Sequence, residues 1–334
     1  MSDAIFLLGA GFNRDAAGEV GPIKCESTYI GKYHITPNYP LVADMWKICF
    51  PESSIDTSIP IEEKIQASVS EGNMSPVKLL CEEIAKCDYY LVPRLIQTES
   101  CYRRFFDRFP KSHFLTFNYD SLAEVFLLRK DSWNPLDGYG IPLEASPYRT
   151  DGKKVELQAS QNQVIHLHGS ICIYESAVDW DTSGKIPYLQ LKEKPVFKFD
   201  PNSIAQLFYP YQKAPLTLGE DREIEQRVIA PIPDKSTGLR GEFVKEMYKK
   251  AGALIGQSER IICIGYDFNP NDHLSYKPIL TSVCKRPDCE LIVISPNANE
   301  IRCRLAKQLP ELEARLTAIE STFKNWVERD FVLK

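Results

Sequence analysis

The sequence lacks long hydrophobic runs. No apolar stretch among its 334 residues approaches the length of about 18–20 residues that a membrane-spanning helix requires. The N-terminus also lacks the succession of a basic segment, an apolar segment and small cleavage-site residues that defines a secretory signal. We therefore expect a cytoplasmic protein that does not associate with a membrane.

An excess of positive charge is also missing. The formal net charge is −5, which disfavours direct binding to nucleic acid. The short basic group Lys245, Lys249 and Lys250 has helical spacing and predicts a solvated helix face. The apolar content of 43% and the charged content of 25% are typical of a globular protein, and the length allows one large core or two smaller ones.

Closely paired cysteines are absent as well. Ten cysteines are present, but none forms a C-x-x-C pair, whereas a structural zinc site usually draws its four ligands from two close pairs. The nearest neighbours are Cys284 and Cys289. Cys172 and Cys263 lie in apolar segments and are expected to be small core residues. We predict reduced thiols and neither zinc nor another metal.

The most informative segment that is present is IFLLGAGFN, from Ile5 to Asn13. Its first four residues are apolar without alternation, as in a strand covered on both faces. Gly9 and Gly11 leave room for a phosphate or a ribose near the main chain, and a helix that begins near Asn13 would direct N–H groups toward that phosphate. Arg14 stands where the dinucleotide-binding fingerprint has a third glycine.

Short buried strands alternate with helices along the chain. We expect strands at 5–8, 113–117, 164–167, 260–264, 291–294 and 316–319. We expect helices at 41–50, 61–70, 76–87, 90–109, 121–130, 242–256 and 300–308, and a last one that opens at 322. This alternation predicts an α/β fold with a Rossmann-like, doubly wound parallel sheet.

We predict that residues 1–334 form a single domain. Its core comprises the segments 1–20, 110–170 and 240–334. Residues 41–109 form a helical insertion between the first two strands, and residues 171–239 form a second insertion of mixed structure, or a lid. The glycines and prolines of residues 14–40 predict a long loop that covers a ligand.

Small or polar residues follow five of these strands. They read Gly9-Ala10-Gly11, Asn118-Tyr119-Asp120, His168-Gly169-Ser170, Gly265-Tyr266-Asp267 and Ser295-Pro296-Asn297. Ligands bind beyond the carboxyl ends of the strands in a doubly wound sheet. We therefore expect these segments to converge on one site.

Two of these segments contain residues with alternative roles. His166 and His168 are two positions apart on a strand and are expected to share a face. At the strand end His168 is the candidate for chemistry, and His166 is the structural histidine. An Asn-x-Asp sequence after a strand is usually a helix N-cap, a role that Asp120 can take while Asn118 contacts the ligand.

Four further polar residues receive no catalytic role. Asp267 and Asp272 are expected to be turn residues. His34 and His273 are expected to lie in loops.

Five segments stand in the order found in the sirtuin superfamily: GAGFN (9–13), LTFNYD (115–120), HLHGS (166–170), IGYDF (264–268) and VISPN (293–297). IAPIPDK (229–235) also resembles a segment of that superfamily. Together they resemble the divergent prokaryotic sirtuin-like proteins in particular. The resemblance implies an NAD-binding, Rossmann-like domain that cleaves the bond between nicotinamide and ribose.

The resemblance also implies roles for individual residues. His168 would be the catalytic base, Asn118 would orient the nicotinamide ribose or a water, and Asp120 would support the site. The implied NAD-binding residues are Gly9, Ala10, Gly11, Phe12, Asn13, Thr116, Gly265, Tyr266, Ser295 and Asn297. Residues 9–12 would line the pyrophosphate. The adenosine half would be held by three of these residues, namely Gly265, Ser295 and Asn297.

Two departures from the sirtuin pattern narrow the implied function. The zinc module of protein-deacetylating sirtuins, with its two C-x-x-C pairs, is missing, and Phe117 replaces the glutamine of their TQN-x-D segment. Zinc-less relatives include NAD-hydrolysing enzymes of bacterial antiviral defence. We therefore expect an NAD+ glycohydrolase that releases nicotinamide and ADP-ribose and acts in antiviral defence (abortive infection) by depleting NAD. The alternatives are an NAD-dependent protein deacylase or ADP-ribosyltransferase, and a non-catalytic sensor of NAD or ADP-ribose.

An unregulated NAD+ glycohydrolase would kill its host, and we expect no separate sensor domain after the last helix. We therefore predict that a homo-oligomer or a partner subunit, such as an ATPase or a nuclease, restrains the activity. Residues 14–40 or 171–239 would supply the contact surface. Size-exclusion chromatography with light scattering, combined with an NAD+ turnover assay, checks this prediction. A monomer that is fully active alone would contradict it.

Overall fold

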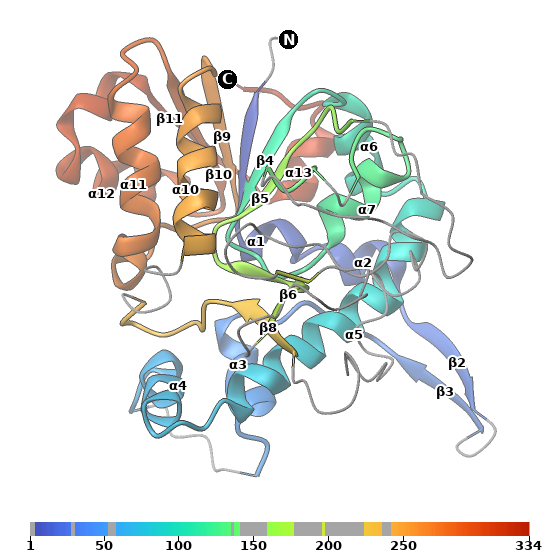
Figure 1. The fold of residues 1–334 in the computed structure, drawn as a ribbon. Helices are drawn as coiled ribbons and strands as arrows, with labels where there is room; N and C mark the ends of the chain where they lie inside the picture. Colours follow the sequence, from blue (N-terminus) through green and yellow to red (C-terminus); the bar gives the residue numbers. More distant parts are fainter. Residues whose placement is uncertain are drawn as a thin grey trace, which may run out of the picture.

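The structure is a computed structural model that describes residues 4–27, 31–52, 58–134, 137–140, 159–176, 196–197, 224–235 and 242–333. Within these ranges, no helix has both the length and the apolar character needed to cross a membrane. Six of the described strands form a central sheet in the middle of the molecule (Figure 1).

The central sheet is parallel throughout. Its strands are β1 (Ile5–Leu8), β4 (His113–Thr116), β5 (Val164–His166), β9 (Arg260–Ile264), β10 (Glu290–Ser295) and β11 (Leu316–Glu320). Their order across the sheet is β11-β10-β9-β1-β4-β5, and every neighbouring pair is parallel. The chain moves outward from β1 in one direction and later from β9 in the other. This order confirms the predicted Rossmann-like, doubly wound sheet.

Helices cover both faces of this sheet (Figure 1). One face carries α10 (Glu242–Ile255), α11 (His273–Cys284) and α12 (Ala298–Gln308), and the other carries α6 (Cys101–Arg108), α7 (Leu122–Leu128) and α13 (Phe323–Glu328). All four residues of β1 are buried, as the unbroken apolar run predicted. On the α6 face, the ring of Phe6 packs edge-on against Phe105 and Phe109, each at a centroid distance of 4.8 Å.

Five strands of the sheet end level with one another. The register aligns the residues Leu8, Thr116, His166, Ile264 and Ile294 in one row. The segments that follow these strands therefore lie at the same edge of the sheet, which is the convergence that the sequence predicted.

The turns after β1 and β9 touch through their backbones. A Cβ atom added to Gly9 would lie 2.6 Å from the Cα atom of Tyr266, and one added to Gly11 would lie 2.8 Å from the Cα atom of Gly265. Gly265 has a φ angle of +64°, and its added Cβ would lie 2.3 Å from the backbone nitrogen of Phe12. All three positions therefore require glycine because two chain segments meet there.

The segment 14–40 is not the long loop that its glycines and prolines predicted. The short helix α1 (Ala10–Asn13) begins at Ala10 rather than near Asn13. It is followed by α2 (Ala16–Val20) and by an antiparallel hairpin of β2 (Ile23–Ser27) and β3 (Gly31–Ile35). Gly21 and Pro22 separate α2 from β2, so these residues delimit short elements. His34, which was expected in a loop, lies in β3.

The helices predicted within 41–109 are present with one change. They are α3 (Val42–Cys49), α4 (Ile61–Ser70), α5 (Ser75–Gln97) and α6. The predicted break between 87 and 90 is absent, because the buried face of α5 continues to Leu91 and Leu95. The chain breaks instead before α6, where the hydroxyl of Ser100 accepts a hydrogen bond from the N–H of Arg103 at 3.2 Å. α3 and α5 lie beyond the carboxyl ends of the central strands (Figure 1).

Two further segments differ from the sequence prediction. The pattern missed α11, which contains Pro278, and His273 is the first residue of this helix rather than part of a loop. Most of the predicted insertion or lid at 171–239 lies outside the described residues. Three of its described parts belong to a three-stranded sheet of β6 (Gly169–Ser176), β7 (Val196–Phe197) and β8 (Ile224–Val228), and residues 229–235 follow β8 without regular secondary structure.

The backbone contact between the two turns predicts a specific mutational cost. Gly265→Ala combines a left-handed backbone with a clash against backbone atoms, so we expect it to lower the free energy of unfolding by about 2–4 kcal/mol. Gly72→Ala is the matched control, because Gly72 has a φ angle of +80° but nothing within 4 Å of an added Cβ. It should cost only about 1 kcal/mol. Urea denaturation measures both values, and equal losses would contradict the steric argument.

Candidate functional site

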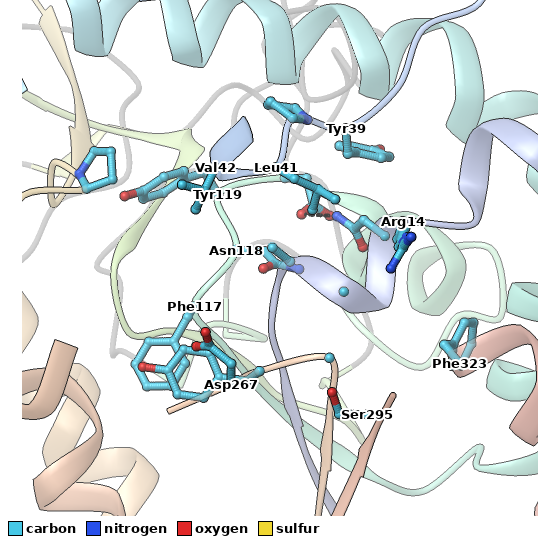
Figure 2. Close-up of a pocket in the computed structure, with 18 of the residues that line it drawn as sticks. Arg14, Tyr39, Leu41, Val42, Phe117, Asn118, Tyr119, Asp267, Ser295 and Phe323 are labelled. Carbon is cyan, nitrogen blue, oxygen red and sulfur yellow. Dashed lines mark hydrogen bonds between the residues drawn. The ribbon is translucent and has the colours of Figure 1, made fainter. Parts of the chain in front are cut away.

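A cavity of about 660 Å³ lies at the carboxyl edge of the sheet. Of the residues predicted from the sequence, Ala10, Gly11, Asn13, Asn118, Asp120, His168, Gly265, Tyr266, Ser295 and Asn297 line it. Figure 2 shows Asn118 between the end of the cavity at Leu41 and Val42 and the end at Ser295. The five strand ends therefore contribute to one cavity.

Three of the residues predicted to bind NAD do not line the cavity. The side-chain direction of Gly9 faces Tyr266. Phe12 is buried with its ring 5.3 Å from Tyr102 and 4.6 Å from Phe323. The hydroxyl of Thr116 accepts a hydrogen bond from the backbone of Asn118 at 3.0 Å and so shapes the turn.

Most N–H groups of the turn after β1 are bonded to the protein rather than open to a phosphate. The N–H of Gly9 donates to the carbonyl of Ile264 at 3.0 Å, and that of Gly11 donates to Gly265 at 2.9 Å. The N–H of Phe12 donates back to Gly9 at 2.9 Å. The contact with the β9 turn therefore uses the N–H groups of Gly9 and Gly11, and the N–H of Phe12 is used within the turn itself.

Asn118 is held at three points. Its backbone N–H donates to Thr116, its backbone carbonyl lies 3.0 Å from Nδ1 of His166, and its side-chain amide nitrogen donates to the carbonyl of Gly9 at 3.1 Å. The amide oxygen has no hydrogen-bond partner among the described residues. It is the side-chain polar atom of Asn118 that these contacts leave available.

His168 is buried at the cavity wall, with 5% of its surface exposed. Its Nε2 atom lies 2.8 Å from the hydroxyl of Ser275 on α11 and 3.7 Å from a carboxylate oxygen of Asp272. Within the described part of the chain, Nδ1 has no hydrogen-bond partner. Burial lowers the pKa of His168 to about 3, an effect that Asp272 opposes and the nearby Lys235 reinforces. The imidazole is therefore uncharged at neutral pH.

The two histidines of the HLHGS segment do not share a face, in contrast to the prediction. β5 ends at His166, and His168 lies in the turn that follows, so the strand alternation does not extend to it. His166 contacts Glu124 on α7 and the backbone of Asn118, whereas His168 contacts α11.

A buried ion pair beside His168 was missed by the sequence reasoning. Lys235 and Tyr266 both donate to the carboxylate of Asp272. Burial raises the pKa of Asp272, but His168, Lys235 and the hydrogen bonds outweigh it, and the net shift is downward. Asp272 ends a short 3₁₀ turn (Pro270–Asp272), as the turn assignment implied. Its contact with Lys235 was not readable from the sequence.

Asp120 connects the turn after β4 to α1. One carboxylate oxygen accepts from the side chain of Asn13 at 2.5 Å, and the other accepts from the N–H of Leu122 in the first turn of α7. Burial and the nearby Glu124 carboxylate raise the pKa of Asp120 to about 6. The N-cap residue of α7 is Ser121, so Asp120 lies one position before the cap that the sequence assigned to it. Its carboxylate still binds the first N–H of α7 and also fixes Asn13.

A second carboxylate, Asp88 on α5, was also missed. It accepts from the hydroxyl of Tyr39 at 2.5 Å and from both the N–H and the hydroxyl of Ser121 at 2.7 Å. Burial and the Asp120 carboxylate raise the pKa of Asp88 to about 8. Its position on the otherwise apolar face of α5, four residues after Ile84, is a signal that the sequence contained.

The two ends of the cavity differ in chemistry. The apolar end is formed by the residues Leu41, Val42, Met45, Leu80 and Ile84. At the polar end, the hydroxyl of Ser295 donates to the side-chain oxygen of Asn297 at 2.5 Å. The cation of Arg14 also lines the cavity, and no described residue forms an ion pair with it.

The described residues contain no cluster of three or more His, Cys, Asp or Glu side chains that could hold a metal ion.

No model of a known protein family and no curated protein matches this chain. Among solved structures, it is similar to Sir2 in complex with the inhibitor EX-527, 2'-O-acetyl-ADP-ribose and a deacetylated p53 peptide. The identity is 12% and the TM-score 0.45, over 98% of this chain and 92% of that chain. It is also similar to Sir2 with a p53 peptide and NAD+, at 11% identity and a TM-score of 0.35 over 98% of this chain and 91% of that chain. Similarity at these values does not assign the chain to a family.

The charges around His168 predict the effect of removing Lys235. Lys235→Met should raise the pKa of His168, because the loss of the cation removes one of the two effects that lower it. It should also lower the free energy of unfolding by about 3–5 kcal/mol, since the buried Asp272 loses its cation. NMR titration and urea denaturation measure the two effects. Lys249→Met, at an exposed lysine, is the control, and an unchanged His168 titration would contradict the assignment.

Proposed function

We propose that this chain is an NAD+ glycohydrolase that releases nicotinamide and ADP-ribose. The observation that carries the proposal is the meeting of His168 and Asn118, from two separate strand ends, in one cavity beside Gly11. The volume of about 660 Å³ lies within the usual range for small-molecule and cofactor sites. The crevice at the point where the strand order reverses is where doubly wound sheets bind dinucleotides.

The described residues fit the parts of NAD. Arg14 lines the cavity and supplies a cation for the pyrophosphate. The main-chain N–H of Ala10 has no protein acceptor among the described residues and offers a second donor at the same place. At the polar end, Ser295 and Asn297 are suited to the hydroxyl groups of the adenosine ribose.

Cleavage of the bond between nicotinamide and ribose requires no proton donor at the leaving group. Nicotinamide in NAD is already a cationic leaving group, so it departs with the bonding electron pair without a general acid. The enzyme must stabilise an oxocarbenium-like ribose and deliver water to it. The amide oxygen of Asn118 can accept a hydrogen bond from that water or from a ribose hydroxyl without adding charge.

The uncharged His168 supplies the base. In the tautomer in which Nε2–H donates to Ser275, the lone pair of Nδ1 is open to the cavity. As water adds to the ribose carbon, its proton passes to Nδ1. A weak base is sufficient because the cationic ribose acidifies the attacking water. The Asp272 carboxylate, 3.7 Å from Nε2, stabilises the resulting imidazolium.

The biological role that we propose is depletion of NAD in antiviral defence. Its support is the resemblance of the five strand-end segments to those of zinc-less relatives with that role. The apolar end of the cavity favours a second candidate, an NAD-dependent deacylase, because an acyl chain would bury its methylene groups there.

The test is nicotinamide release from NAD+ by the purified protein, with and without candidate partner subunits. His168→Ala and Asn118→Ala should each lower kcat/KM at least about 100-fold, whereas His34→Ala, at an exposed strand position, should leave it unchanged. An acetyl-lysine peptide separates the candidates, because only a deacylase couples nicotinamide release to loss of the acetyl group. Undiminished turnover in both site variants would refute the assignment, and tight binding of NAD+ without turnover would indicate a sensor.

A further inference from the structure

The histidine that the sequence assigned to a structural role, His166, lies directly behind Asn118. It is buried, with 1% of its surface exposed. Its Nδ1 atom lies 3.0 Å from the backbone carbonyl oxygen of Asn118, and its Nε2 atom lies 2.7 Å from a carboxylate oxygen of Glu124 on α7. Glu124 is also buried, with 2% of its surface exposed.

Both ring nitrogens of His166 therefore face an oxygen that only accepts hydrogen bonds. A neutral imidazole has one N–H donor and one lone pair, so in either tautomer one nitrogen would oppose a carbonyl or a carboxylate oxygen with its lone pair. A doubly protonated ring satisfies both contacts. The carboxylate of Glu124 balances the positive charge.

We propose that His166 and Glu124 form an imidazolium–carboxylate pair that positions Asn118 for the reaction. The pair holds the Asn118 carbonyl from one side while Thr116 and Gly9 hold its N–H and its side-chain nitrogen. With these three contacts in place, the amide oxygen is the free polar group of Asn118. His166 and Glu124 are positioning residues, since neither is among the residues that line the cavity.

The charges around His166 agree with this assignment. Burial lowers the pKa of His166, but the Glu124 carboxylate and the hydrogen bonds to Glu124 and to the Asn118 carbonyl outweigh it, so the net pKa is raised. Asp120, in the turn after β4, contributes in the same direction. Two further ionisable groups lie near the pair. The hydroxyl of Tyr139 donates to the same oxygen of Glu124 at 3.1 Å, and its ring centroid lies 5.8 Å from that of His166. The thiol of Cys172 is buried, and the Glu124 carboxylate adds to the effect of burial in raising its pKa.

The His166–Glu124 pair sets an upper pH limit on activity, whereas His168 sets no such limit. Because the folded-state pKa of His166 is raised, its charged form persists below that pKa and is lost as the pH rises through it. Deprotonation would remove one donor and release either the Asn118 carbonyl or Glu124. Activity should therefore fall on the alkaline side, whereas His168 is neutral throughout the physiological range.

The direct test is the ring ¹⁵N NMR signal of His166, assigned among five histidines by its absence in His166→Gln. The wild-type ring should carry protons on both nitrogens at pH 7.5. Glu124→Gln should lower the proton affinity of His166 more than tenfold, a shift of over one pH unit. Tyr139→Phe should raise it, because Oε1 of Glu124 loses a competing donor. Glu328→Gln, which removes an exposed carboxylate, should leave it unchanged.

A wild-type His166 that is neutral at pH 7.5, or a titration that is unmoved by both Glu124→Gln and Tyr139→Phe, would overturn the proposal. A second, kinetic test rests on the proposed function. In Glu124→Gln, the decline of kcat/KM for nicotinamide release at alkaline pH should begin at a lower pH. A merely structural role would lower kcat/KM by the same factor at every pH. Since the NMR signal needs no turnover, failure of the charged pair and failure of the glycohydrolase assignment remain distinguishable.

Discussion

The close approach of two backbone turns is the constraint on which the site depends. The turns after β1 and β9 meet where the strand order reverses, and the space that a side chain would need at Gly9, Gly11 or Gly265 is occupied by main chain. The N–H groups of Gly9 and Gly11 donate to the carbonyl oxygens of Ile264 and Gly265, and the N–H of Gly265 donates in turn to Ile294 of β10. This contact closes the floor of the cavity, so the side chains of the other strand ends converge above a rigid base.

The local electrostatic environment shifts the pKa values of His166 and His168 in opposite directions, although the two residues are only two positions apart. Contacts with a carboxylate and a carbonyl raise the pKa of His166 despite its burial. Burial and the nearby Lys235 lower the pKa of His168, although the Asp272 carboxylate opposes them. The ring of Phe117 lies 4.8 Å from that of His168 and stacks on Tyr266 at 4.3 Å. The one histidine is suited to hold structure and the other to exchange a proton.

The sequence predicted the sheet and the convergence of its strand ends because both follow from local patterns. Each strand is a short apolar run, and each is followed by residues too small or too polar for a buried strand, as at Gly9 and Asn118. Strand length and the register of parallel pairs then brought those residues to one edge. Direct contact with the cavity was predicted for Gly9 and Phe12 as well, but the contact with the β9 turn and the aromatic packing of Phe12 remove it.

The interactions that the sequence did not reveal are those between distant segments. Lys235 and Asp272 are 37 positions apart, and His166 and Glu124 are 42 apart. No local spacing encodes such pairs, since they arise only when helices pack on the finished sheet. Asp88 is the exception, because a carboxylate on the apolar face of α5 breaks a visible periodicity.

The central claim is that this cavity holds a dinucleotide with its reactive ribose at His168 and Asn118. A crystal structure with bound ADP-ribose tests it most directly. We expect the pyrophosphate near Arg14 and Gly11, the adenosine at Ser295 and Asn297, and the terminal ribose within hydrogen-bonding distance of Asn118 and His168. A ligand bound outside this cavity, or one whose terminal ribose points away from His168, would contradict it.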